Sequence, residues 1–406
     1  MINNMSRAQT YLSQPIKIGQ RIARNRFVIN AMECGDADSA GGISNRTIER
    51  YQSLFTGMAG IVVFESVTMQ MHSRARKNQL LFNPYDKENI DKWRRFFRQL
   101  KAINPNVLLI VQLNHGGEKS SDLFSRKLCP KPVYGMGGEM VDEAYIEEMI
   151  QSFVDASKAL YDIGADGVDL KYGHGYMICD ILRPYNDRKW KYGGSWENRS
   201  RVPFEITERV RRVINDEKFL VGSKITMWEG FPGGVGTAGA DTAVMDLTEP
   251  IQLLKGLEER GSNFFIESNV PSIPRRNHPE DVYLHFTMAK IMKEALKKDT
   301  VVIGSAYSIL NYGNNQLQKV PSEKKSLFYL GNYNIEHGYT DMISIGRQSL
   351  ADPLLPQKYL TDQEDNIKWC IGCDICEKLL HSQSHVGCAT HYSEYLDIYK
   401  KTLQTR

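Results

Sequence analysis

Short apolar runs alternate with amphipathic helical patterns along most of this chain. Apolar runs of this length, separated by helical patterns, are typical of buried strands. We expect eight such strands, at residues 27–32, 61–65, 107–113, 167–170, 219–226, 263–266, 300–303 and 342–345.

Helical patterns fill most of the stretches between these runs. Apolar side chains recur every three or four positions in residues 143–163, and residues 86–103 carry Trp93, Phe96 and Leu100 at the same spacing. About eight strand-then-helix units predict an α/β fold of the (β/α)8 TIM barrel type. A doubly wound sheet is the structural alternative, but a nucleotide fingerprint does not follow its first strand.

One glycine motif would favour the doubly wound sheet if it bound a dinucleotide. Residues 234–239 match G-x-G-x-x-G, the pattern of dinucleotide-binding turns. The match follows no strand closely and opens no helix until about Asp246. We therefore expect a loop after the fifth strand.

Composition narrows the class of protein. The 406 residues include 51 basic and 48 acidic side chains, so charge indicates neither a nucleic-acid partner nor a membrane surface. No stretch approaches about 18 uninterrupted apolar residues, and the N-terminal segment lacks the apolar core of a secretory signal. Four of the seven cysteines crowd near the C-terminus, which indicates a cytoplasmic protein with reduced thiols or metal ligands.

The candidate chemistry lies in residues 164–201. Lys171, His174 and Tyr176 directly follow the expected strand 167–170. Three groups that hold or move protons, at the C-terminal end of a barrel strand, are typical of an active site. A merely polar surface loop is the alternative.

Two motifs in this stretch resemble those of the old yellow enzyme family (NADH:flavin oxidoreductase / NADH oxidase). The motifs are HGY at 174–176 and YGGSWENRSR at 192–201, close to the family's H-x-x-[HN]-G-Y and Y-G-G-S-x-E-N-R-x-R. Lys171 stands where the family commonly has His. The resemblance extends over roughly residues 15–360 and implies an FMN-dependent oxidoreductase.

The resemblance also implies which residues contact FMN. The implied contacts to the isoalloxazine ring include Gln112, whose amide suits the pyrimidine edge, and Lys224, where the family has Arg and a cation stabilises reduced flavin. A phosphate is expected between the loops after the seventh and eighth strands. The full set of implied flavin contacts is Ala31, Met32, Glu33, Ser66, Gln112, Lys224, Gly304, Ser305, Gly346 and Arg347.

The implied reaction is reduction of an activated C=C bond next to a carbonyl, thioester or carboxylate. NAD(P)H or an electron-donor protein would supply the electrons, His174 and Lys171 would polarise the substrate oxygen, and Tyr176 would protonate the α-carbon. Lys171 makes the site more cationic, which favours an acidic or strongly polarised substrate. Amine oxidation is the rival within the family, and it ranks lower because Lys171 would repel an ammonium group. A catalytically idle flavin-binding barrel is the rival from another class.

The C-terminal cysteines form a separate motif. Cys370, Cys373, Cys376 and Cys388 have a spacing compatible with an iron–sulfur cluster or tetrahedral zinc. The motif resembles the CIGC of larger family members, similar to trimethylamine dehydrogenase and 2,4-dienoyl-CoA reductase, which implies a [4Fe–4S] cluster. The alternative is that the cysteines are free and the motif is a degenerate remnant of a cluster site. In the larger relatives Asn-Pro follows the fourth Cys, whereas Ala389-Thr390-His391 stands there in this chain. We expect an FMN-binding barrel over residues 1–362 and a Cys-rich appendage, packed on the barrel, over residues 363–406.

Overall fold

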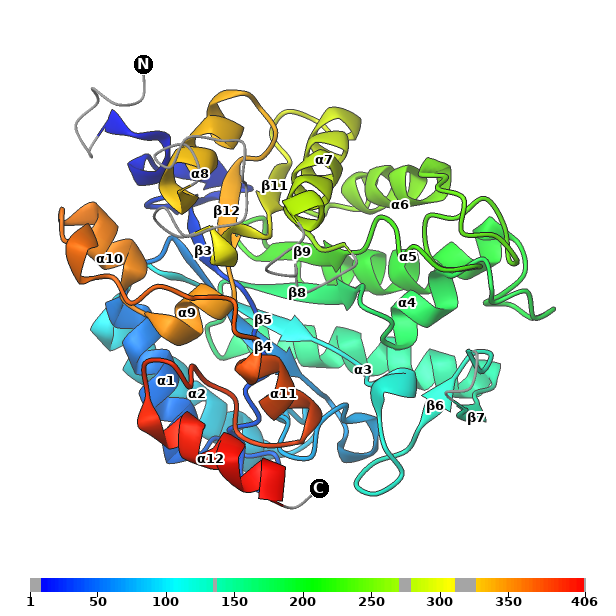
Figure 1. The fold of residues 1–406 in the computed structure, drawn as a ribbon. Coiled ribbons are helices and arrows are strands. Elements are labelled where there is room, and N and C mark those ends of the chain that lie inside the picture. The colour runs from blue at the N-terminus through cyan, green and yellow to red at the C-terminus, as the bar shows by residue number, and fades with distance from the viewer. Residues whose placement is uncertain (1–8, 134–136, 270–278, 311–325, 405–406) are drawn as a thin grey trace.

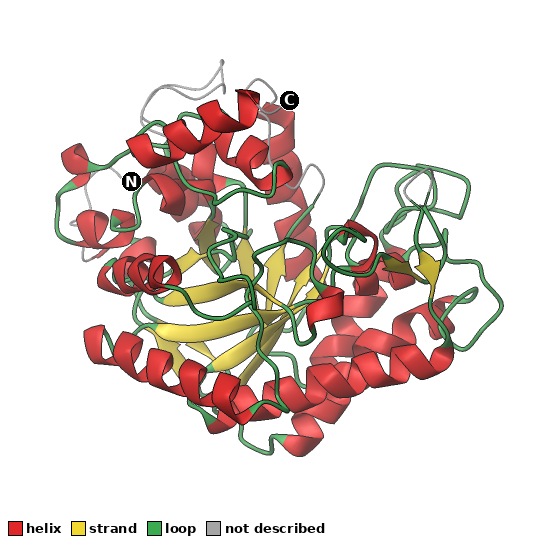
Figure 2. Cartoon of the chain, turned by 90° about the horizontal axis from the view of Figure 1, so that it is seen from below, coloured by secondary structure: helices red, strands yellow, loops and turns green. Residues whose placement is uncertain are grey.

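Eight parallel strands close into a barrel in the computed structural model, which describes residues 9–133, 137–269, 279–310 and 326–404. The last strand pairs with the first, and helices surround the ring (Figures 1 and 2). The (β/α)8 prediction is confirmed. The barrel strands are β3 (Phe27–Ile29), β4 (Ile61–Val67), β5 (Leu108–Leu113), β8 (Gly167–Tyr172), β9 (Leu220–Ile225), β10 (Phe264–Glu267), β11 (Val301–Gly304) and β12 (Met342–Ile345).

Burial explains why these strands read as unbroken apolar runs. Every residue of the eight barrel strands is buried, because one face packs inside the barrel and the other packs under helices. The polar residues in the strands, such as Gln112, Asp169 and Lys171, are therefore exceptions that require partners.

Many of the longer helices begin at polar caps. Ser44, Asp86, Asp142, Ser195 and Ser326 each accept a hydrogen bond from a backbone amide in the first turn of the helix that follows. The helices are α1 (Asn45–Thr56), α2 (Lys87–Ile103), α3 (Glu143–Asp162), α4 (Met177–Leu182), α5 (Trp196–Val213), α6 (Thr248–Glu259), α7 (Pro279–Ala295), α8 (Leu327–Glu336), α9 (Arg347–Ala351), α10 (Leu355–Leu360), α11 (Ile375–His381) and α12 (Ser393–Gln404).

The YGGSWENRSR motif has a structural role in this arrangement. Ser195 caps α5, and the Asn198 amide donates to the carbonyls of Trp190 and Gly193. Arg199 is buried and forms a bidentate pair with Glu249 on α6. The motif therefore fixes the long loop that follows the catalytic candidates.

An N-terminal hairpin closes the end of the barrel at which the strands begin. Strands β1 (Ile16–Ile18) and β2 (Arg21–Ala23) pair antiparallel, and Ile18 and Ala23 join the buried cluster inside the barrel. Arg21 forms an ion pair of 3.1 Å with Asp166, directly before β8. The other end of the barrel, where the strands end, is not covered by this hairpin. A second small pair, β6 (Leu128–Cys129) with β7 (Glu139–Met140), lies beside the barrel (Figure 1).

The G-x-G-x-x-G segment lies in a loop, as expected. Residues 234–239 fall between β9 and α6, and Thr237 bridges to Met245. Helix α6 begins only at Thr248. The polar segment 305–322 after β11 contains a short 3-10 turn at Tyr307–Ile309, and its remainder beyond residue 310 lies outside the described residues.

The C-terminal segment packs against the first helices of the barrel (Figure 1). Arg50 on α1 donates to the carbonyl of Val386 and to the hydroxyl of Tyr395, at 2.8 and 3.1 Å. Its Nε lies 2.6 Å from the fully buried carboxylate of Asp36. Arg50, which is held by this buried ion pair within the barrel, thus joins the barrel to the C-terminal segment and its last helix through hydrogen bonds. Among the helices of the described residues, none has the length and apolar character to cross a membrane.

Candidate active site

A cavity of about 340 Å³ opens at the C-terminal end of the barrel. All three catalytic candidates, Lys171, His174 and Tyr176, line it. Most of the expected flavin contacts line it as well: Ala31, Met32, Glu33, Lys224, Ser305, Gly346 and Arg347. Residues far apart in the chain thus meet at one end of the barrel, as the strand-end argument predicts.

Local backbone geometry places the catalytic candidates. Lys171 is on β8, and Tyr176 immediately precedes α4. Between them, His174 and Gly175 adopt a left-handed conformation, each with φ of 64°. The His174 amide donates to Thr226, and a side chain at Gly173 would collide with the same Thr226 hydroxyl at 2.6 Å. Glycine at 173 is therefore required for the close approach of β8 and β9.

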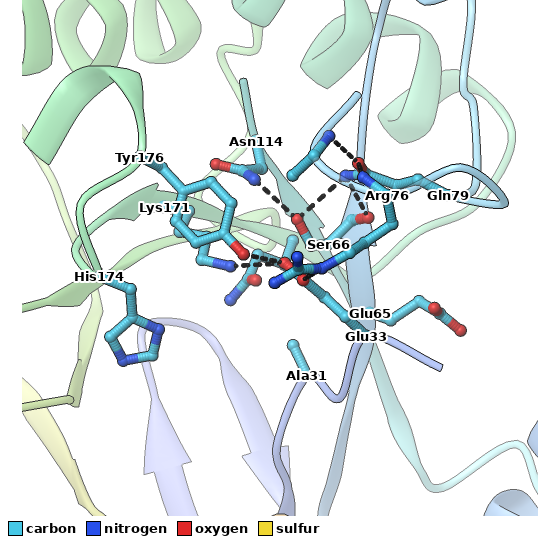
Figure 3. Close-up of polar contacts among 12 residues, drawn as sticks. Ala31, Glu33, Glu65, Ser66, Arg76, Gln79, Asn114, Lys171, His174 and Tyr176 are labelled. Atoms are coloured by element: carbon cyan, nitrogen blue, oxygen red, sulfur yellow. Dashed lines mark hydrogen bonds and ion pairs between the residues drawn. The ribbon is translucent and has the colours of Figure 1, made fainter. Parts of the chain in front are cut away.

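Glu33 stands at the centre of the site (Figure 3). Its Oε1 accepts hydrogen bonds from the Tyr176 hydroxyl at 2.5 Å and the Lys171 ammonium at 3.1 Å. Its Oε2 accepts from Arg76 Nε at 2.9 Å. The Lys171 ammonium also lies 3.8 Å from the centre of the Tyr176 ring. The extra cation expected from Lys171 is therefore paired with a carboxylate rather than free.

Burial and charge set the protonation states of this cluster. Burial alone would raise the pKa of Glu33, but the charges of Lys171 and Arg76 lower it below the ordinary value. Burial, reinforced by the carboxylate of Glu33, raises the pKa of the Tyr176 phenol well above its ordinary value. Glu33 is thus a carboxylate at neutral pH, and Tyr176 keeps its proton.

His174 takes a different position in the cavity. Its Nε2 is hydrogen-bonded to the Ser268 hydroxyl at the end of β10. Burial, with the nearby charges of Lys224 and Lys171, lowers the pKa of His174 well below its ordinary value. The imidazole is therefore neutral at physiological pH and can act as a hydrogen-bonding group rather than a cation.

Lys224 supplies the second lysine of the cavity. Its ammonium donates to the Asn30 amide oxygen at 2.7 Å. Burial lowers the pKa of Lys224 to about 8, although Asp169 counteracts this. The barrel lysine thus has a polar partner and retains most of its charge at neutral pH.

Three expected flavin contacts do not line the cavity. The Gln112 amide donates to Asp169 at 2.6 Å, and the Ser66 hydroxyl accepts from Asn114 at 2.8 Å. Gly304 packs against Thr340, and a Cβ added to Gly304 would stand 3.0 Å from the Thr340 hydroxyl oxygen. The roles of Gln112, Ser66 and Gly304 toward a flavin remain predictions.

The expected phosphate side of the cavity contains Ser305, Gly346 and Arg347. A Cβ at Gly346 would stand 2.8 Å from the Met32 sulfur, so a side chain at this position would force Met32 to move. The Arg347 guanidinium, 6% exposed, pairs with Asp374 at 2.6 Å. A buried arginine beside glycine backbone is a common arrangement for binding phosphate.

Several lining residues were not anticipated. Asn30 directly follows β3, and Ser268 directly follows β10, so their strand-end positions were usable signals. Arg76 comes from the loop between β4 and α2, where no motif or periodicity marks it. His285 on α7 lies 2.9 Å from the buried Glu267 carboxylate, and a helical pattern alone gives no sign of that pair.

The four C-terminal cysteines line one small cavity of about 20 Å³ together with Arg347. Helix α11, which carries Cys376, also contributes Glu377, Leu380 and His381 to the larger cavity. The described residues contain no group of three or more His, Cys, Asp or Glu side chains arranged to hold a metal ion. The four thiols thus share one cavity, and their role as ligands of a [4Fe–4S] cluster stays a prediction.

Comparisons with known proteins agree with this geometry. A sequence model of the NADH:flavin oxidoreductase / NADH oxidase family matches residues 11–366. The chain is 26% identical over 374 residues to an NADH oxidase of Thermoanaerobacter brockii, covering 88% of this chain and 52% of that protein. It is 29% identical over 391 residues to a dimethylamine dehydrogenase of Hyphomicrobium sp., covering 90% and 47%. The chain spans about half the length of these curated relatives.

Solved structures share the fold. A 2-naphthoyl-CoA reductase bound to 2-naphthoyl-CoA superimposes with a TM-score of 0.78 at 21% identity, over 94% of this chain and 57% of that one. At this identity the similarity establishes a shared fold.

Proposed function

The chain belongs to the NADH:flavin oxidoreductase / NADH oxidase family, and on that premise we propose that it is an FMN-dependent, NAD(P)H-oxidising ene-reductase. The substrate class is an α,β-unsaturated carbonyl compound, thioester or carboxylate. One observation carries the proposal: Lys171, His174 and Tyr176 line the same cavity as Lys224 and Arg347.

The residues present suit FMN. Arg347 and the backbone at Gly346 would hold the phosphate, and Lys224 would stand near the pyrimidine ring of the flavin. On β8, the strand next to that of Lys224, the Oδ1 atom of Asp169 is buried without a hydrogen-bond partner, and the Gln112 amide donates to its Oδ2. An orphaned buried oxygen next to an amide that can rearrange is consistent with a ligand completing this network.

FMN would supply hydride chemistry at this place. The chain's own residues would orient the substrate and move the proton. Lys171 and His174 would donate hydrogen bonds to the substrate oxygen and stabilise the negative charge that develops on it. Tyr176 would turn from Glu33 and give its phenolic proton to the α-carbon.

Amine oxidation is the second candidate, and one observation favours it. Glu33 neutralises Lys171, which weakens the argument that Lys171 repels an ammonium substrate. The cavity nevertheless remains rich in cations, because Arg76, Lys119, Lys224 and Arg347 also line it.

An anaerobic assay decides between the two candidates. Cinnamate should oxidise the NADH-reduced protein, whereas dimethylamine should leave the oxidised protein unbleached; the reverse result would establish amine oxidation. A yellow protein that NADH and NADPH both fail to bleach would indicate an idle barrel.

Loss of Arg347 should release the flavin. A charge-assisted hydrogen bond contributes about 1.5–3 kcal/mol, so Arg347→Ala should raise the FMN dissociation constant about 10- to 100-fold. Ultrafiltration of the yellow protein, followed by fluorescence of the released flavin, measures the constant. The matched control is Arg188→Ala, which removes an arginine that donates to the Val141 carbonyl outside the cavity. Full FMN retention in Arg347→Ala would contradict the phosphate assignment.

We also propose that Cys370, Cys373, Cys376 and Cys388 bind a [4Fe–4S] cluster that exchanges electrons with a donor or acceptor protein. The donor set suits a cluster because four thiols share one cavity beside a cation. Anaerobic reconstitution should give about four iron atoms and four sulfides per chain, and Cys373→Ser should lose most of both. Cys129→Ser, a buried cysteine on β6, is the control. One zinc per chain without sulfide would point to a structural metal instead.

A further inference from the structure

We propose that Arg76, Lys171 and Tyr176 form a carboxylate-binding site, which Glu33 occupies until the carboxylate of a substrate replaces it. The inference rests on the proposed function, since it names the acid group of the substrate. It also assigns roles to two residues, Arg76 and Glu33, that act on the substrate's charge rather than on its double bond.

The contacts are those of a built anion site. Three donors from separate parts of the chain converge on one carboxylate: Lys171 from β8, Tyr176 from the start of α4, and Arg76 from the loop after β4. The distances to Glu33 are 3.1, 2.5 and 2.9 Å. Figure 3 shows the three side chains pointing at the same group. Such charge-assisted donors bind any carboxylate of suitable reach.

The charge balance of the cavity favours a second anion. The Lys171 side chain is 4% exposed and the Arg76 side chain 15% exposed, so water screens their charges poorly. Glu33 is the carboxylate in direct contact with both cations, whereas Asp169, which also acts on Lys171, accepts its hydrogen bond from Gln112. Burying an uncompensated charge is costly, and a negatively charged ligand would reduce that cost.

Glu33 is placed so that it can move aside. It lies between the end of β3 at Ile29 and the start of α1 at Asn45, in a segment without helix or strand. The backbone two residues later, at Gly35, is left-handed with φ of 62°. The side chain of Glu33 carries a carboxylate, the same group that the substrate would present. One carboxylate can therefore replace the other at Arg76 and Lys171, and the Tyr176 phenol donates to it until it turns to give its proton to the α-carbon.

Binding of simple probes to the yellow, oxidised protein tests the proposal. Glu33→Gln keeps the shape of the side chain but removes the charge that competes with the ligand. Because like charges at short range are strongly unfavourable, benzoate should bind at least about tenfold more tightly to this variant. Benzamide, a neutral probe of similar size, should change by less than about twofold. Isothermal titration calorimetry measures both constants without turnover.

Two further variants locate the effect. Glu377→Gln removes a carboxylate from the same cavity, and the ion pair of Glu377 is with His381 at 3.7 Å, away from the cluster. It should change benzoate affinity by less than about twofold, because it does not compete for the same donors. Adding Arg76→Gln to Glu33→Gln should cancel the gain, because one of the two cations is lost.

The proposal fails if Glu33→Gln leaves benzoate affinity unchanged or weaker, or if benzamide gains as much as benzoate. If Glu33→Gln does not fold, Glu33→Asp serves instead, since it withdraws the charge by one methylene and should give a smaller gain of the same sign. No gain with Glu33→Asp would then overturn the proposal. The result is independent of the reaction: failure to reduce cinnamate would reject the proposed function, whereas benzoate binding tests the carboxylate site alone.

Discussion

Tyr176→Phe should slow the oxidation of the reduced protein by an enone about 10²- to 10⁴-fold, the usual contribution of a positioned acid. The substitution removes only the phenolic proton that the α-carbon would take. Reduction of the oxidised protein by NAD(P)H should stay near the wild-type rate, since that half-reaction needs no phenol. Glu33 keeps Lys171 and Arg76 as partners in the variant, so the site should retain its charge balance.

Stopped-flow measurement of the two half-reactions separates the explanations. Tyr172→Phe is the matched control, because it removes a buried hydroxyl that contacts Thr207 rather than the cavity. A quinone acceptor should be spared in Tyr176→Phe, since it needs no protonation at carbon. Equal slowing of both half-reactions would assign Tyr176 a structural role, and no slowing would mean that the proton comes from elsewhere.

Arg50→Met should lower the free energy of unfolding by about 3–5 kcal/mol, the usual cost of breaking a buried ion pair. Its partner Asp36 is fully buried and would lose its 2.6 Å contact. The Val386 carbonyl and the Tyr395 hydroxyl would lose their donor as well. Urea unfolding measures the change.

Two comparisons make this stability prediction specific. Arg212→Met, which breaks an exposed pair with Glu208, should cost less than about 1 kcal/mol. Adding Asp36→Asn to Arg50→Met should recover part of the loss, because it removes the buried carboxylate that has lost its nearest cation. A loss below about 1 kcal/mol in Arg50→Met would show that solvent reaches Asp36 in the variant.

Much of the barrel was predictable from the sequence because its strands are buried on both faces. That burial forces continuous apolar runs, so strands such as β4 and β12 stand out between helical patterns. The β1–β2 hairpin was missed for the opposite reason. Its strands have three residues each and mix exposed with buried positions, which is too short to show a period.

The site was predictable where it depends on strand ends and motifs, as for Lys171, His174 and Tyr176. The contacts of Glu33 were not, because they depend on the path of the loop that carries Arg76. That path is set by packing between distant segments, and local sequence does not encode it. The same reason hid the contribution of α11, whose short helix reaches the cavity only through the fold of the cysteine segment.

The wall that α11 adds to the cavity has a consequence for exchanging parts between related enzymes. The family match ends at residue 366, yet Glu377, Leu380 and His381 stand at the cavity beyond that limit. A protein cut at the family boundary would keep the barrel and lose one side of its pocket. Conversely, a chimera that keeps this barrel and takes the following segment from another member would present new side chains to the substrate. The substrate range of such enzymes could then be diversified by swapping this C-terminal segment, with the catalytic barrel left untouched.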